Sequence, residues 1–148
     1  MATTDRYLRD ICELLIDSRL GYGDAAGRAN DPRLHDLLAG IGETRLAMIA
    51  NVSNRIGHMG APVPHNGTFK GTIHRAWMAI RDLLSNTHDV NMIAECHRGE
   101  SYLIGKYDAA LRDGALPEDV RTLLSGQRVE LMANLMEIRS LDSVLSDA

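Results

Sequence analysis

Apolar residues recur every three or four positions through most of the chain, which is the spacing of one face of an α-helix. Five such stretches are separated by short segments rich in Gly, Pro, Asn and Ser. They predict helices over residues 4–29, 32–59, 68–84, 88–113 and 117–144. The first boundary is the clearest, because Asp31 is a good N-cap and Pro32 suits the first helical position.

Four of these helices are long and one is short. The two outer connections are tight, whereas the middle one is long and contains the short helix 68–84. A bundle with one long crossover has the topology of ferritin-like folds. The sequence therefore predicts a single all-α domain over residues 1–148: a ferritin-like four-helix bundle with an extra short helix in the crossover between the second and third long helices.

Composition narrows the class of protein. Hydrophobic residues make up 45% of the 148 residues and aromatic residues only 4%, which favours a helical core over a sheet. The net charge of −4 argues against general binding to nucleic acid or to a membrane surface. No apolar run reaches membrane-spanning length, and the first residues lack the pattern of a signal peptide. A cytoplasmic location is expected, with Cys12 and Cys96 as reduced, buried thiols.

Polar residues interrupt the apolar faces of the long helices at about the same height. This central polar layer consists of Ser18, Arg45, Glu100, Gln127 and Asn134, and Asp17 and Glu13 lie beside it. An unpaired charge in a core is costly, so Arg45 and Glu100 should meet each other or lie in a wet pocket. One interpretation is a ligand site formed by Glu100, Arg45, Gln127, Asn134 and Asp17. The other, which we favour, is a buried ion pair with amide partners that fixes the register of the helices.

Metal binding and catalysis have little support in the pattern. Di-iron bundles use Glu-x-x-His motifs, and here no acidic residue has a His three positions later; His97 precedes Glu100 by three. The Arg45 guanidinium would also repel a cation. Cys96 and the adjacent His97 point about 100° apart on a helix and form no catalytic dyad. We therefore predict no metal, no cofactor, no catalytic residue and no enzymatic activity.

Three glycines in the first helix, Gly21, Gly23 and Gly27, each weaken it by about 1 kcal/mol relative to Ala. They would be tolerated if a neighbouring element packs closely against them.

Two segments carry a family resemblance. Residues 71–78, which include His74, Arg75 and Trp77, and residues 94–100, which include Glu95 and Glu100, resemble motifs of an uncharacterised bacterial family of ferritin-like four-helix-bundle proteins. The resemblance extends to residues 107–111, to the segment around Tyr22 and to Arg45.

The resemblance implies a ferritin-like bundle and no established activity. In that family the last helix often carries a His seven residues after its Gln, whereas this chain has Asn134 after Gln127. This departure weakens the metal interpretation further. For the first motif, we expect Trp77 to anchor its helix and Arg75 to pair with a carboxylate such as Glu95, in preference to forming a binding surface.

The sequence thus favours a non-enzymatic bundle that acts through binding or assembly. The alternative is a degenerate metal- or small-ligand-binding bundle with its site at the central polar layer. The sequence is also compatible with a homo-oligomer held through an exposed Met or Leu face.

Overall fold

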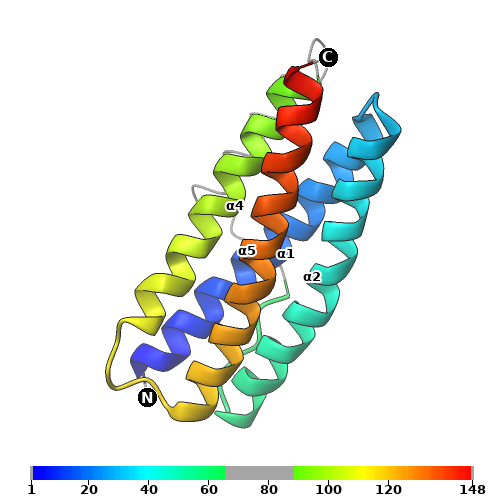
Figure 1. The fold of residues 1–148 in the computed structure, drawn as a ribbon. Coiled ribbons are helices and arrows are strands. Elements are labelled where there is room, and N and C mark those ends of the chain that lie inside the picture. The colour runs from blue at the N-terminus through cyan, green and yellow to red at the C-terminus, as the bar shows by residue number, and fades with distance from the viewer. Residues whose placement is uncertain (1, 66–88, 148) are drawn as a thin grey trace.

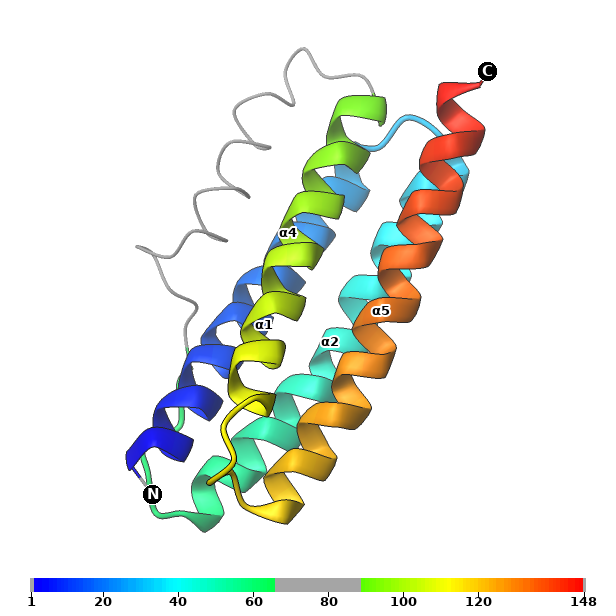
Figure 2. The same cartoon turned by 60° about the vertical axis from the view of Figure 1, so that its left-hand side comes forward.

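The computed structural model describes residues 2–65 and 89–147 of the chain (Figures 1 and 2). These residues form four helices and no strand: α1 (Ala2–Arg28), α2 (Pro32–His58), α4 (Asp89–Leu111) and α5 (Glu118–Ser146). The four predicted long helices are therefore confirmed, with ends that differ by one or two residues. The predicted short helix 68–84 lies outside the described residues, as do His74, Arg75 and Trp77.

The start of α2 follows local sequence chemistry. Asp31 has an extended backbone, and its side chain accepts a hydrogen bond from the Arg33 backbone N–H at 2.8 Å. Pro32 occupies the first helical position, where its missing N–H would have no helical partner. The predicted N-cap is confirmed.

The four helices lie side by side, with α1 against α2 and α4 against α5 (Figure 2). In Figure 1, α1 and α5 run upward, whereas α2 and α4 run downward. The end of α2 and the start of α4 thus lie at opposite ends of the bundle.

Polar contacts fix both ends of the bundle. At one end, the Asp89 carboxylate accepts hydrogen bonds from the backbone N–H groups of Asn30 and Asp31, at 3.0 and 2.7 Å. At the other end, the Tyr7 hydroxyl donates to Asp113 at 3.1 Å. These contacts join α4 to the α1–α2 turn and to the start of α1.

The core is formed by apolar residues from all four helices. Its members follow the predicted stripes and include the fully buried Leu8, Leu15, Leu34, Leu38, Val52, Ile56, Ile93, Leu103, Val120, Leu124, Leu131 and Ile138. Burial of such side chains is the main favourable term in folding, at about 1.5–3 kcal/mol each.

The expectation for Gly23 and Gly27 is wrong for the described residues. A Cβ added at either position would meet nothing within 4 Å. The close approach of α1 and α2 occurs instead at Gly42, where an added Cβ would lie 3.5 Å from the Tyr22 Cβ and 3.7 Å from the Arg19 carbonyl oxygen. At this approach of α1 and α2, the glycine that faces the neighbouring helix is thus on α2.

Within residues 2–65 and 89–147, no helix combines the length and apolar character needed to cross a membrane.

Candidate functional site: the central polar layer

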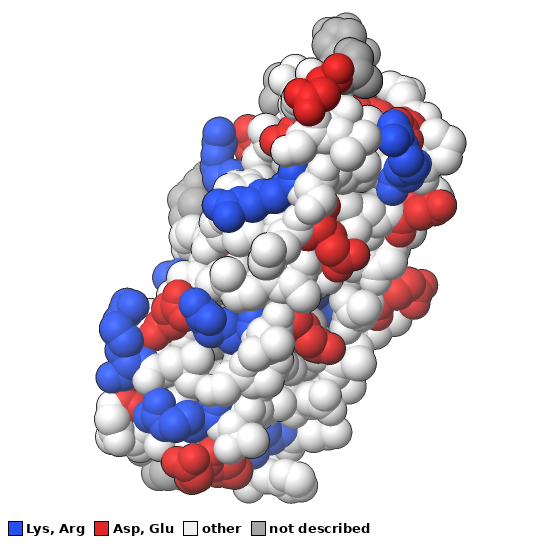
Figure 3. All heavy atoms as spheres, in the orientation of Figure 1, with Lys and Arg blue, Asp and Glu red and all other residues white. Residues whose placement is uncertain are grey.

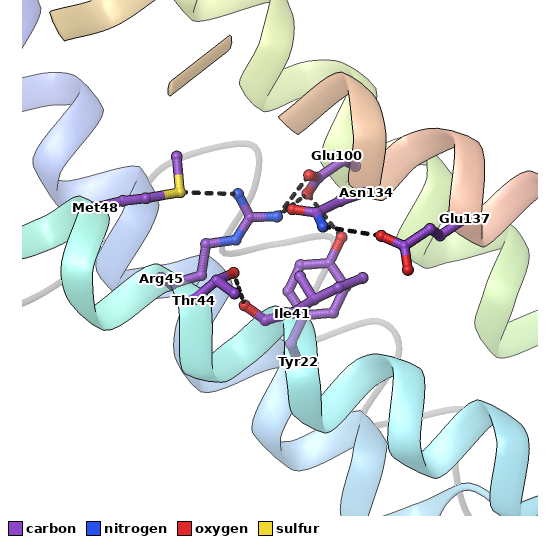
Figure 4. A network of polar contacts seen from close by, with 8 residues as sticks. All are labelled: Tyr22, Ile41, Thr44, Arg45, Met48, Glu100, Asn134 and Glu137. Carbon is purple, nitrogen blue, oxygen red and sulfur yellow. Dashed lines mark hydrogen bonds and ion pairs between the residues drawn. The ribbon is translucent and has the colours of Figure 1, made fainter. Parts of the chain in front are cut away.

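Arg45 of α2 and Glu100 of α4 meet in the middle of the bundle (Figure 4). The Arg45 Nη2 atom donates to both carboxylate oxygens of Glu100, at 2.7 and 2.5 Å. Both side chains have an exposed fraction of 0%. The remaining terminal nitrogen, Nη1, lies 3.8 Å from the Met48 sulfur. The structure therefore places a charge pair where the sequence showed two interruptions of the apolar stripes.

Tyr22 of α1 completes the immediate surroundings of Glu100. Its hydroxyl donates to Glu100 Oε1 at 2.7 Å. The Arg45 guanidinium carbon also lies 5.4 Å from the centre of the Tyr22 ring, within the range of a cation–π contact. Three hydrogen bonds from two residues thus reach a carboxylate that is almost fully removed from water, and these bonds offset part of its desolvation.

A second set of contacts lies beside this pair and includes α5. The Tyr107 hydroxyl donates to the Gln127 side-chain oxygen at 2.6 Å. The amide nitrogen of Gln127 donates to the Met48 backbone oxygen at 3.1 Å. Polar contacts therefore connect α4 to α5 and α5 to α2, while Tyr22 connects α1 to α4.

The protonation states follow from burial and charge. Burial raises the pKa of Tyr22 well above its ordinary value, and the Glu100 carboxylate adds to this shift. Burial likewise raises the pKa of Tyr107. For Arg45, burial acts to lower the pKa, but the charge and hydrogen bond of Glu100, together with Tyr22 and Tyr107, outweigh it and the pKa is raised. Both phenols therefore stay protonated as donors, and Arg45 stays charged.

The other residues of the predicted site are placed differently. Asn134 is half-buried, and its amide nitrogen donates to Glu137 on the same helix at 3.4 Å. Its side-chain oxygen is buried and has no hydrogen-bond partner among the described residues, so Asn134 lies at the edge of the core with that oxygen facing inward. Ser18 and Asp17 are buried, with exposed fractions of 1% and 5%.

The motif at residues 94–100 has some side chains in the core and others at the surface. Glu95 pairs with Arg98, one helical turn away, at 2.9 Å. His97 is half-buried, and its Nε2 atom accepts a hydrogen bond from Arg139 of α5 at 3.0 Å. Neither side chain belongs to the contacts around Glu100.

The thiols are unsuited to nucleophilic chemistry. Cys12 and Cys96 are free and buried, as expected. Burial raises the pKa of both, and the charge of Glu100 adds to the shift at Cys96. Since the thiolate is the reactive form, a raised pKa makes each thiol inert near neutral pH.

Metal ligands do not gather in the described part of the chain. Among those residues, no group of three or more His, Cys, Asp or Glu side chains could hold a metal ion. Glu100 has a guanidinium and a phenol as neighbours, and neither is suited to share a cation with it.

Sequence reasoning missed the roles of Tyr22 and Tyr107. Neither tyrosine was included in the predicted polar layer. A signal was available, because a buried tyrosine hydroxyl usually finds a hydrogen-bond partner. Tyr22 lies four residues after Ser18 and Tyr107 seven after Glu100, which places both near polar positions of the same faces.

These features define a class: an all-α protein whose bundle carries a buried arginine–glutamate pair at its centre. The chain belongs to a family defined by a domain of unknown function, DUF2383, whose family model matches residues 3–113. The matched region runs from α1 through the end of α4 and contains Tyr22, Arg45, Glu100 and Tyr107, but not α5. No curated protein matches the chain.

Proposed function

We propose that this chain is a ferritin-like four-helix bundle of the cytoplasm that catalyses no reaction and acts through binding or assembly. In this proposal the central polar layer fixes helix register, and the function resides on the surface.

The arrangement around Glu100 carries the proposal. Both of its oxygens accept hydrogen bonds from Arg45, and one also accepts from Tyr22. A metal ion would have to displace a fully buried guanidinium and leave that charge unpaired, which costs several kcal/mol. The Glu100 carboxylate is thus satisfied within the chain.

The surface supports a protein partner over nucleic acid. On the face shown in Figure 3, Lys and Arg are interspersed with Asp and Glu, so no field of one sign covers it. The net charge of −4 likewise argues against a general affinity for phosphate backbones.

A second candidate function has one specific observation in its favour. The Nε atom of Arg45 and the Oγ atom of Ser18 are buried, and neither has a hydrogen-bond partner among the described residues. Buried polar atoms are normally satisfied. Unpartnered atoms on two neighbouring helices are the groups that would hold a small polar ligand.

Metal loading tests the main proposal. The purified protein would be incubated anaerobically with Fe(II), Mn(II) or Zn(II), desalted and subjected to elemental analysis, together with the Glu100→Ala variant. The exposed Glu137→Ala variant is the matched control. We expect less than a tenth of an equivalent (~0.1) to be retained in every sample.

One or two equivalents retained by the wild type and by Glu137→Ala, but lost from Glu100→Ala, would overturn the proposal. Native mass spectrometry of the untreated protein examines the second candidate. A mass above that of the chain, lost in Ser18→Ala, would favour a small polar ligand.

A further inference from the structure

A surface groove of about 630 Å³ runs along the outer face of α1 and α2. Five of its eleven lining residues are small, among them Gly23 and Gly27 from α1 and Ala39 and Gly42 from α2. Large apolar side chains project beside one end of it: Leu20 is 60% exposed and Leu46 is 45% exposed.

Two glycines of α1, Gly23 and Gly27, have no explanation in the packing of the described residues. A Cβ at Gly23 or Gly27 would meet nothing within 4 Å. Glycine in a helix costs about 1 kcal/mol relative to alanine, so two exposed glycines one turn apart weaken α1 without improving its contact with α2. A glycine surface does, however, let another backbone approach closely.

Two unlike charges lie on opposite sides of this groove. Arg19 of α1 and Glu43 of α2 both line it, both are exposed, and neither forms an ion pair within the described residues. The contact of Gly42 with Tyr22 fixes the relative height of the two antiparallel helices. At that register Arg19 and Glu43 lie within about one helical turn of the same level.

We propose that the groove is the interface of a homodimer, in which a second copy packs groove to groove. The two-fold axis would run along the groove, parallel to the helices. This arrangement places α1 of one subunit over α2 of the other. The inference rests on the proposed assembly function and specifies its partner and its surface.

The positions of the groove residues make this interface self-complementary. Leu20 would pack on Leu46 of the partner subunit, and Arg19 would face Glu43 of the partner subunit; the symmetry forms each contact twice. An unrelated helix in the groove would need its own matching charges, whereas a second copy already carries them. The small residues allow the helices to approach closely enough for these pairs to form.

Charge reversal tests the proposal with the full-length protein. We expect the wild type to sediment as a dimer, and Arg19→Glu and Glu43→Arg each to weaken dimerisation by about tenfold or more, because like charges then face each other twice. An equimolar mixture of the two single variants should recover the dimer, since each mixed dimer has opposite charges at both positions. Arg112→Glu, on an exposed arginine beyond α4, is the control and should leave the dimer intact.

A glycine pair provides a second measurement. The Gly23→Ala/Gly27→Ala variant should keep its helical circular dichroism, because the added methyl groups meet open space, yet dimerise at least about tenfold more weakly. The matched control is Gly105→Ala/Gly126→Ala, which adds the same groups to open space on α4 and α5.

Two outcomes would overturn the proposed dimer interface. One is a wild-type protein that sediments as a monomer at micromolar concentration. The other is a dimer unaffected by every groove variant, which would direct attention to the face around Met136 and Val144. Either result leaves the non-metal, non-enzymatic function standing, since the metal-loading experiment decides that separately.

Discussion

Glu100 is a single side chain on which the arrangement of the helices depends. Its carboxylate is buried and accepts three hydrogen bonds from Arg45 and Tyr22. Removing two charges from water costs several kcal/mol per ion, and the mutual attraction repays this only with good geometry and additional hydrogen bonds. The pair therefore adds little net stability over apolar residues but excludes arrangements in which the two partners fail to meet.

Removing one partner should be far more harmful than removing both. We expect Glu100→Ala to lower the free energy of unfolding by about 3–5 kcal/mol, because Arg45 is then left charged and unpaired. The double variant Arg45→Met/Glu100→Leu should lose less than the sum of the single variants Arg45→Met and Glu100→Leu, each compared with the wild type. Urea unfolding of all four proteins, with the exposed Glu137→Ala as control, measures the coupling. Additive losses would show that the two residues act independently.

Among the elements, the start of α4 has the most specific anchor. Asp89 lies in the first turn of α4 and accepts the backbone N–H groups of Asn30 and Asp31. These two amides belong to the turn between α1 and α2. One carboxylate thereby couples the two helical pairs at this end of the bundle.

Asp89→Ala should lower the free energy of unfolding by about 1.5–3 kcal/mol, the range for hydrogen bonds to a charged group. Asp89→Asn should lose less, because it keeps one acceptor oxygen. Amide hydrogen exchange provides the specific readout: Asn30 and Asp31 should exchange faster, while core amides of α2 change only with global stability. The exposed Asp36→Ala serves as the control. Unchanged exchange at both amides would contradict the assigned contact.

At the scale of the whole molecule, stability should depend on alkaline pH. Burial raises the folded-state pKa of Tyr22 and of Tyr107, whereas an unfolded tyrosine titrates near its ordinary pKa of 10.0. The folded protein therefore holds these protons more tightly than the unfolded chain does. The stabilisation is fully present below pH 10 and is lost as pH rises above it.

We expect the free energy of unfolding to fall above pH 10 by up to about 1.4 kcal/mol per pH unit for each of the two tyrosines. Tyr22→Phe and Tyr107→Phe should each be less stable at pH 8, having lost a hydrogen bond, but should show a shallower alkaline decline. Tyr102→Phe, at a half-buried position, should keep the wild-type slope. Equal slopes in all four proteins would contradict the assignment.

Helix periodicity was the most informative pattern in the chain, because it reflects local geometry. Apolar spacing located the four described helices to within one or two residues, and Asp31 and Pro32 located the start of α2. A helix and its cap depend on residues within four positions of each other, and such interactions are visible in the sequence.

The candidate site was predictable only in part. The height of Arg45, Glu100 and Gln127 followed from the interrupted stripes, and each of them is buried. The position of Asn134 at the core edge did not follow, because a small rotation of α5 decides whether a residue beside the stripe faces inward. The groove between α1 and α2 was not predicted from the sequence either. Glycines at positions 23 and 27 are equally consistent with a close packing contact inside the protein.

The sequence by itself determined which segments are helical, which faces are buried and that an arginine and a glutamate share one core. Only the tertiary structure decided which groups contact each other. Tyr22 donates to Glu100, Gln127 donates to a backbone oxygen of α2, and Asp89 accepts from the α1–α2 turn. The physical reason is the separation, along the sequence, of the residues that interact. Periodicity and capping arise within a few residues, whereas these contacts join side chains on different helices, 58–79 positions apart in the chain. Their geometry depends on the height, rotation and separation of helices that pack together only in the folded protein.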